Sequence, residues 1–205
     1  MVQKFYSQSA QRKMNKLLDK LLRVLLSTLF LSSVTAPAEG LNFWIEGQTY
    51  RLQKERGYSE VLAWVNGKIS GPAGYFVLAE VASNGYRQIY GGPSLKPTSW
   101  LELGVGIGQE NVGNRNRRAA YFSADGERLS LSGYFENGAS GSFHKVFLNY
   151  KATEFIKVGL MDQTSVGFGP KVTYNITKNT AVWGAVLRDH ATHVTNFIFA
   201  VNSQF

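Results

Sequence analysis

Charged residues in the strand-like segments of this chain separate by sign. The acidic ones are Glu46, Glu60, Glu80 and Glu102, and the basic ones, all later in the chain, are Lys145, Lys157, Lys171 and Arg188. Arg87 is the exception, a basic residue within the acidic half. If the fold brings the two halves face to face, the opposed charges set up a field that acts on ions and dipolar solutes. The charged residues therefore predict a site where an acidic surface and a basic surface act together on ions or dipolar solutes.

Residues suited to catalysis or metal binding are few. The histidines are His144, His190 and His193, and the segment 189–193 carries two of them three residues apart, a spacing that could bind a metal. This segment falls in an expected loop, where histidines are usually solvated. No Ser is placed beside a His in the way that a lipid hydrolase requires. We therefore expect no metal, no cofactor and no enzymatic activity.

The elements that must position the charges read as strands from end to end. Residues 39–205 are rich in Gly, Tyr, Phe, Val and Leu, with turn signals every ten to fourteen residues, which indicates an all-β sandwich or barrel. In residues 100–109, Leu101, Leu103, Val105 and Ile107 share one face. The other face is nearly bare glycine with one carboxylate, which is unusual for a surface exposed to water.

An internal repeat fixes the relation between the strands. Residues 95–105 match residues 150–160 in type, and a looser copy runs over 174–185; each contains a turn with a threonine, Thr98, Thr153 or Thr177. Equivalent turns should lie on one side of the sheet. Counting between them predicts an even number of strands, twelve, at 42–50, 58–66, 73–82, 86–95, 100–109, 118–124, 128–136, 142–150, 155–162, 166–174, 180–188 and 194–205. Ten strands, or eight with longer loops, also fit the length.

The first 38 residues predict a secretory signal peptide. A basic stretch precedes the apolar run 24–34, and Ala36-Pro37-Ala38 is a small-residue cleavage pattern, so we expect cleavage after Ala38. A membrane anchor or an amphipathic helix is the alternative, although the run is shorter than the ~20 residues of a spanning helix. Removing residues 1–38 leaves 16 basic and 13 acidic residues, a net charge of +3. This small net charge gives little support for nucleic-acid binding, which usually requires a strongly basic surface. Because the chain contains no Cys, the exported protein cannot be stabilised by disulfides.

The last residues alternate in the manner of a strand with one apolar face. Phe197, Phe199, Val201 and Phe205 fall on that face together with the polar Ser203. This ending resembles the C-terminal strand of bacterial outer-membrane β-barrel proteins, from whose pattern Ser203 departs. The resemblance implies that this strand is an assembly signal read by the barrel-assembly machinery. It also implies a closed antiparallel up-and-down transmembrane barrel at residues 39–205, located in the outer membrane.

In such a barrel one face of every strand meets lipid. The outward set contains Leu103, Val105 and Ile107 and, on the strand at 180–188, Ala181, Trp183 and Leu187. Near the repeated turns this face ends in Tyr150, Tyr174 and Phe205, as expected of an aromatic girdle. We expect the basic loop residues Arg115, Arg117 and Arg118 at the opposite, exterior end, where they either contact lipopolysaccharide phosphates or are simply solvated.

The inward set then defines the function. Across a water-filled lumen, the acidic wall (Glu46, Glu60, Glu80, Glu102) and the basic wall (Lys145, Lys157, Lys171, Arg188) produce a transverse field like that of general porins, which predicts a small channel for polar or charged solutes. If the side chains meet, they plug a non-conducting structural barrel instead. Inward Trp64, Phe76, Leu78, Phe143 and Phe147 narrow the lumen. An outer-membrane lipid-modifying enzyme and a secreted soluble β-sandwich that binds ligands are the remaining alternatives.

Overall fold

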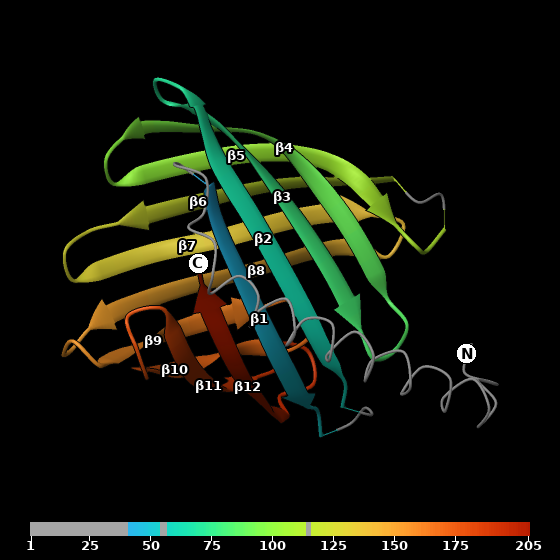
Figure 1. The fold of residues 1–205 in the computed structure, drawn as a ribbon. Helices are drawn as coiled ribbons and strands as arrows, with labels where there is room; N and C mark the ends of the chain where they lie inside the picture. The colour runs from blue at the N-terminus through green and yellow to red at the C-terminus, as the bar shows by residue number, and fades with distance from the viewer. Residues whose placement is uncertain (1–40, 54–56, 114–115) are drawn as a thin grey trace.

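The computed structural model describes residues 41–53, 57–113 and 116–205, which form twelve antiparallel β-strands closed into a barrel (Figure 1). Each strand pairs with the next in sequence, and the first pairs with the last. The signal peptide predicted at residues 1–38 lies outside the described residues. The strands are β1 (Leu41–Arg51), β2 (Ser59–Ser70), β3 (Ala73–Ala82), β4 (Arg87–Thr98), β5 (Leu101–Glu110), β6 (Asn116–Asp125), β7 (Leu129–Gly138), β8 (Gly141–Lys151), β9 (Ile156–Gln163), β10 (Gly167–Asn175), β11 (Thr180–Arg188) and β12 (Thr195–Gln204).

The prediction of an even-stranded, up-and-down barrel is confirmed by this topology. No helix in the described part of the chain is long and apolar enough to cross a bilayer. The barrel closes where β1 meets β12, and at its edge the main chains of Phe43 and Phe205 exchange two hydrogen bonds of 3.1 and 2.8 Å. Closure leaves no strand edge unpaired, which is what a sheet with an apolar outer face requires.

The three repeated turns share one hydrogen bond. In each, a threonine hydroxyl accepts a hydrogen bond from the backbone N–H three residues later: Thr98 from Leu101 at 3.1 Å, Thr153 from Ile156 at 3.0 Å, and Thr177 from Thr180 at 2.9 Å. All three lie at one end of the barrel, the turn end. The connections at residues 83–86, 164–166 and 189–194 lie at the other end, which we call the loop end.

Alternation along the strands sorts side chains between the outer wall and the lumen. On β5, Leu103, Val105 and Ile107 are exposed on the outer wall, whereas Gly104 and Gly106 are buried inside. A Cβ on Gly104 would lie 2.1 Å from the ring of Tyr121, and one on Gly106 would lie 2.9 Å from the ring of Phe76. The bare glycine face seen in the sequence is therefore the space into which lumen aromatic rings pack.

The predicted register of β11 is wrong by one residue. Trp183 and Leu187 are buried and face the lumen, as does Ala181, whereas Arg188 is exposed on the outer wall opposite Phe168 of β10. The cause is the turn: counted from its threonine, Thr180 is equivalent to Ile156, so the outward positions of β11 are even-numbered. Because β11 is apolar on both faces, its composition does not reveal this register.

Arg87 also lies on the outer wall rather than in the lumen. It is paired with the outward Val81 of β3 and is exposed. Arg87 was predicted as a basic residue among the acidic residues of the lumen, and this prediction is wrong.

Candidate functional site in the lumen

Seven of the eight predicted wall residues point into the lumen. Glu46, Glu60, Glu80 and Glu102 do so from β1, β2, β3 and β5, and Lys145, Lys157 and Lys171 do so from β8, β9 and β10. Arg188 does not, because of the register of β11. The two groups occupy opposing parts of the closed barrel, as the sequence predicted.

In the loop half of the lumen the two walls meet directly. Lys145 Nζ of β8 donates hydrogen bonds to Gln48 Oε1 at 2.6 Å and to Tyr50 Oη at 3.2 Å, and lies 3.8 Å from Glu60 Oε1. Tyr50 Oη donates to Glu60 at 2.8 Å and accepts a hydrogen bond from Gln163 of β9 at 3.3 Å. These five residues, which we call the bridging network, are all buried. Strands β1 and β8 are five strands apart by the shorter way round, so the network crosses the lumen.

A second buried group lies beside it and surrounds Arg117. The guanidinium bonds Glu110 Oε2 at 3.0 Å through Nη1 and Glu136 Oε2 at 2.9 Å through Nε. Glu136 also accepts hydrogen bonds from Tyr90 Oη at 2.6 Å and from Gln88 Nε2 at 3.2 Å, which links β7 to β4. We call these five residues the arginine cluster. It adds a second set of contacts that fill the loop half of the lumen.

The position of Arg117 corrects the lipopolysaccharide prediction. Only 3% of its side chain is exposed, because the residue lies inside β6 and faces the lumen rather than standing in an exterior loop. Arg118 points outward and is exposed, and Arg115 lies outside the described residues. Glu110 and Glu136 were not among the predicted lumen residues. Both follow the inward alternation of their strands, from Glu102 on β5 and from Ser132 on β7, which would have identified them.

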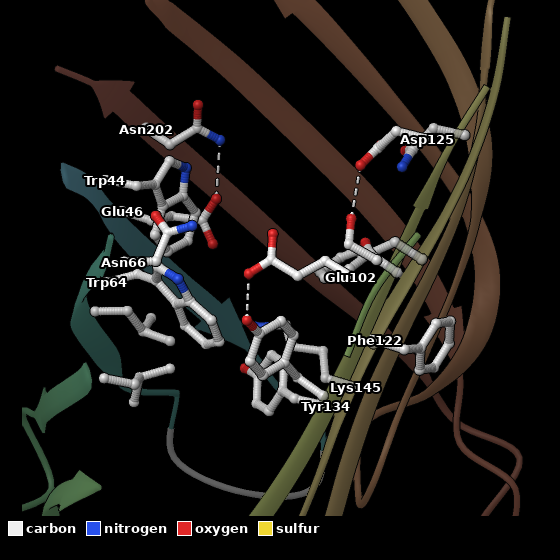
Figure 2. A pocket seen from close by; sticks show the side chains of 18 of the residues that line it. Trp44, Glu46, Trp64, Asn66, Glu102, Phe122, Asp125, Tyr134, Lys145 and Asn202 are labelled. Carbon is white, nitrogen blue, oxygen red and sulfur yellow. Dashed lines mark hydrogen bonds between the residues drawn. The ribbon is translucent and has the colours of Figure 1, made fainter. Parts of the chain in front are cut away.

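The turn half of the lumen is open. A cavity of about 520 Å³ lies there, lined by aromatic and charged side chains that include Trp44, Trp64, Glu46 and Glu102 (Figure 2). Lys171 lines it as well. Glu46 accepts hydrogen bonds from Trp183 Nε1 at 2.7 Å and from Asn202 Nδ2 at 2.9 Å, and Tyr121 donates to Glu102 at 2.5 Å. Acidic and basic side chains thus line one cavity in this half.

A smaller cavity of about 260 Å³ continues from the first and shares Trp44, Lys171 and Trp183 with it. Its lining combines three lysines, Lys157, Lys171 and Lys178, with amide and hydroxyl side chains, and no carboxylate among the described residues lines it. Lys171 Nζ lies 4.9 Å from the ring centroid of Trp183 and 5.2 Å from that of Phe147. This cavity is the basic part of the lumen.

Aromatic side chains narrow the lumen as predicted. Trp64 stacks on Phe76 with ring centroids 5.1 Å apart, and Tyr121 packs edge-on against Phe76 at 4.7 Å. Leu78, Phe143 and Phe147 also point inward.

The histidines lie outside the lumen. His144 faces the outer wall, where its Nε2 is 3.1 Å from Asp162 Oδ2 and its Nδ1 is 2.9 Å from the hydroxyl of Thr164. His190, in the loop that follows β11, contacts the other oxygen of Asp162 at 2.7 Å. His193 has a positive φ of 56°. No group of three His, Asp or Glu side chains in the described ranges is arranged to hold a metal ion.

The loop that carries His190 and His193 is held by an aspartate. Asp189 accepts hydrogen bonds from the hydroxyl and the N–H of Thr192 and from the N–H of Ala191. These bonds hold the pKa of the Asp189 carboxyl below its usual value, the Thr192 hydroxyl contributing most. Asp189 thus shapes this loop.

Three of the four predicted assembly residues are exposed on the outer wall, and the fourth, Phe205, is half-buried beside the ring of Phe43. Phe197, Phe199 and Val201 are exposed on it, and Tyr150 and Tyr174 are exposed on the same wall at the turn end.

Comparisons with known proteins address the fold. No family model matches the chain, and no curated protein matches it in sequence. Among solved structures it is similar to the KdgM porin, with a TM-score of 0.54 and 14% identity over 79% of this chain and 99% of that one. The KdgM porin in complex with disordered oligogalacturonate gives a TM-score of 0.51 at 14% identity, covering 79% of this chain and 98% of that one. The chain therefore has the fold of a porin-like outer-membrane β-barrel.

Proposed function

We propose that this protein is an outer-membrane channel for small polar or charged solutes. The observation that carries the proposal is the cavity in the turn half, which Glu46, Glu102 and Lys171 line together inside a closed barrel. Opposed charges in a narrow space of low dielectric orient dipolar solutes and attract ions.

Placement in a membrane is supported by the outer wall. Its exposed side chains on β5 and β9 are apolar along the middle of the barrel, and aromatic residues follow at the turn end: Leu103, Val105, Ile107, Val158, Leu160, Tyr150 and Tyr174. Such a wall costs free energy in water and is stable against lipid. The signal peptide expected at residues 1–38 agrees with export, and the termini of the barrel would then face the periplasm.

The charge of the smaller cavity favours anions at the turn end. Lys157, Lys171 and Lys178 line it together with amides and hydroxyls that can bind carboxylate or phosphate oxygens. The KdgM porin, which shares the fold, was solved with oligogalacturonate, a polyanion. We infer an anion preference for this lumen as well.

The bridging network limits passage. Its side chains are nearly inaccessible, with Lys145 and Gln163 each 1% exposed, so a solute that enters the cavity stops at this level unless the network opens. The conducting state then requires Lys145 to leave Gln48, Tyr50 and Glu60. A barrel in which it never leaves is a non-conducting structural protein.

The experiment that tests the proposal is conductance of the refolded barrel in planar bilayers. Residues 39–205 are refolded in detergent, and heat-modifiable gel mobility first verifies barrel formation. Steps of ionic current, larger with anions in a salt gradient, would support the channel. A heat-modifiable barrel that never conducts under applied voltage would contradict the channel proposal and would support a non-conducting structural role.

A lipid-modifying activity is the second candidate, favoured by one contact. The Thr164 hydroxyl, His144 and Asp162 form a relay of 2.9 and 3.1 Å on the outer wall, where lipid esters would be within reach. In such a relay the imidazole accepts the hydroxyl proton and the carboxylate orients the ring. Release of fatty acid from phospholipid micelles that is lost in both Thr164→Val and His144→Ala would support it.

A further inference from the structure

Exposed arginines on the outer wall gather at one end of the barrel. Arg51, Arg87, Arg118 and Arg188 all point outward near the loop end, and all four are exposed. At the turn end the outward positions of β8, β9 and β10 carry Tyr150, Ile156 and Tyr174 instead. If the outer wall lies in a membrane, the arginines stand at the depth of one layer of lipid headgroups.

One of these arginines, Arg51, lines a groove in the outer wall, and Arg188 lies two residues beyond another lining residue, Val186. The groove has a volume of about 400 Å³ and runs over β1, β12 and β11, where its lining is almost wholly apolar: Thr49, Arg51, Gly184, Ala185, Val186, Phe197, Ile198 and Phe199. Phe197 and Phe199 form its raised side, with 43% and 58% of their surfaces exposed. The groove has the character of a site for a hydrocarbon chain.

Gly184 creates the depth of this groove. A Cβ at this position would meet one atom only, the carbonyl oxygen of Ile198 at 3.7 Å, which is an ordinary contact. The backbone does not require glycine there, so a larger side chain would simply occupy the hollow. The hollow exists because residue 184 has no side chain, and a larger residue at this position would fill it without disturbing the barrel.

The register places the arginines at the loop end of the groove. Arg51 and Val186 both lie opposite Phe197, on either side of β12, and Arg188 lies two residues beyond Val186. With strands ~4.8 Å apart and a rise of ~3.4 Å per residue, the backbone positions of Arg51 and Arg188 lie roughly 12 Å apart, on either side of β12 and two residues offset along it. No carboxylate among the described residues pairs with either arginine.

We propose that this groove binds a phosphate-bearing lipid, with an acyl chain along Gly184 and Phe199 and the phosphate between Arg51 and Arg188. The inference rests on the proposed membrane placement. Guanidinium groups bind phosphate oxygens through paired, charge-assisted hydrogen bonds. The apolar groove running from the arginines toward the middle of the outer wall suits the chain attached to such a headgroup.

Native mass spectrometry of the refolded barrel in detergent tests this assignment, with diphosphoryl lipid A as the probe. We expect retained lipid A adducts, and weakening by about tenfold for each of Arg51→Gln and Arg188→Gln, as the loss of a charge-assisted hydrogen bond predicts. Gly184→Leu should weaken binding similarly by filling the groove. Arg118→Gln on β6 and Val105→Leu on β5, outward substitutions away from the groove, are the matched controls and should retain the adducts.

Three results would overturn the assignment. Equal loss in Arg118→Gln would mean that charge alone attracts the lipid. Displacement of lipid A by inorganic phosphate would mean that the acyl groove contributes nothing. A dimer whose formation is abolished by Gly184→Leu would assign the groove to a second copy of this chain. Heat-modifiable mobility and conductance are measured on the same samples, so failure of the groove is distinguishable from failure of the channel.

Discussion

Lys145 of β8 and Gln48 of β1 meet across the lumen, with Nζ 2.6 Å from Oε1. They are 97 residues apart in sequence and belong to opposing walls. Nothing in the alternation of either strand specifies this contact, since it depends on the diameter of the closed barrel and on the lengths of the two side chains. The contact between Lys145 and Gln48 marks the boundary between the filled loop half of the lumen and the open turn half.

Removing the bridge should open the lumen. The double variant Lys145→Met, Glu60→Gln removes both charges, so that neither is left buried alone. We expect higher single-channel conductance in planar bilayers than for the unmodified barrel. Lys151→Met, a change of the same type at the turn end of β8, should leave conductance unchanged. Equal conductance of the double variant and the parent would argue against the bridging network as the barrier.

Reversing the basic wall should reverse ion preference. Lys157→Glu with Lys171→Glu places carboxylates in the cavity that now holds lysines, so selectivity should move from anions toward cations. The reversal potential in a salt gradient measures this, in the opened Lys145→Met, Glu60→Gln background if the parent conducts poorly. Arg188→Glu, on the outer wall, is the matched control. If the ion selectivity of an open pore stays the same after both lysines are replaced, the transverse-field proposal is wrong.

Arg117 should be among the residues most important for stability. Arg117→Met leaves Glu110 and Glu136 buried with no cationic partner, and breaking a buried pair in this way costs about 3–5 kcal/mol. Urea unfolding in detergent, followed by tryptophan fluorescence, measures the loss. Arg118→Met, one residue along and exposed, should change the free energy of unfolding by less than about 0.5 kcal/mol. Similar effects of the two substitutions would contradict the lumen position of Arg117.

The register of β11 can be tested by labelling, because the chain contains no Cys. A thiol at Val186 should react with a lipid-soluble maleimide in vesicles, whereas a thiol at Ala185, buried in the lumen, should not. The opposite pattern would restore the register predicted from the sequence.

Much of the barrel follows from local sequence, and the exceptions have physical causes. The strand number and the side of each turn were predictable because threonine turns repeat and strands alternate. β11 was misplaced because Val, Trp, Ala and Leu leave both of its faces apolar. Arg117 was misassigned because it lies at the boundary of a loop and a strand. Which charges would be bridged and which would face open space was not predictable, since it depends on depth in the closed barrel.

The repeated threonine turns make the barrel modular. Thr153 and Thr177 bracket one hairpin, β9 and β10, and any segment between equivalent turns contains an even number of strands. Such a segment can be excised or duplicated without turning a lumen face toward the outside, because two strands restore both direction and alternation. The circumference of this barrel can therefore change in steps of one hairpin, and the width of the lumen becomes a quantity that is set by copy number.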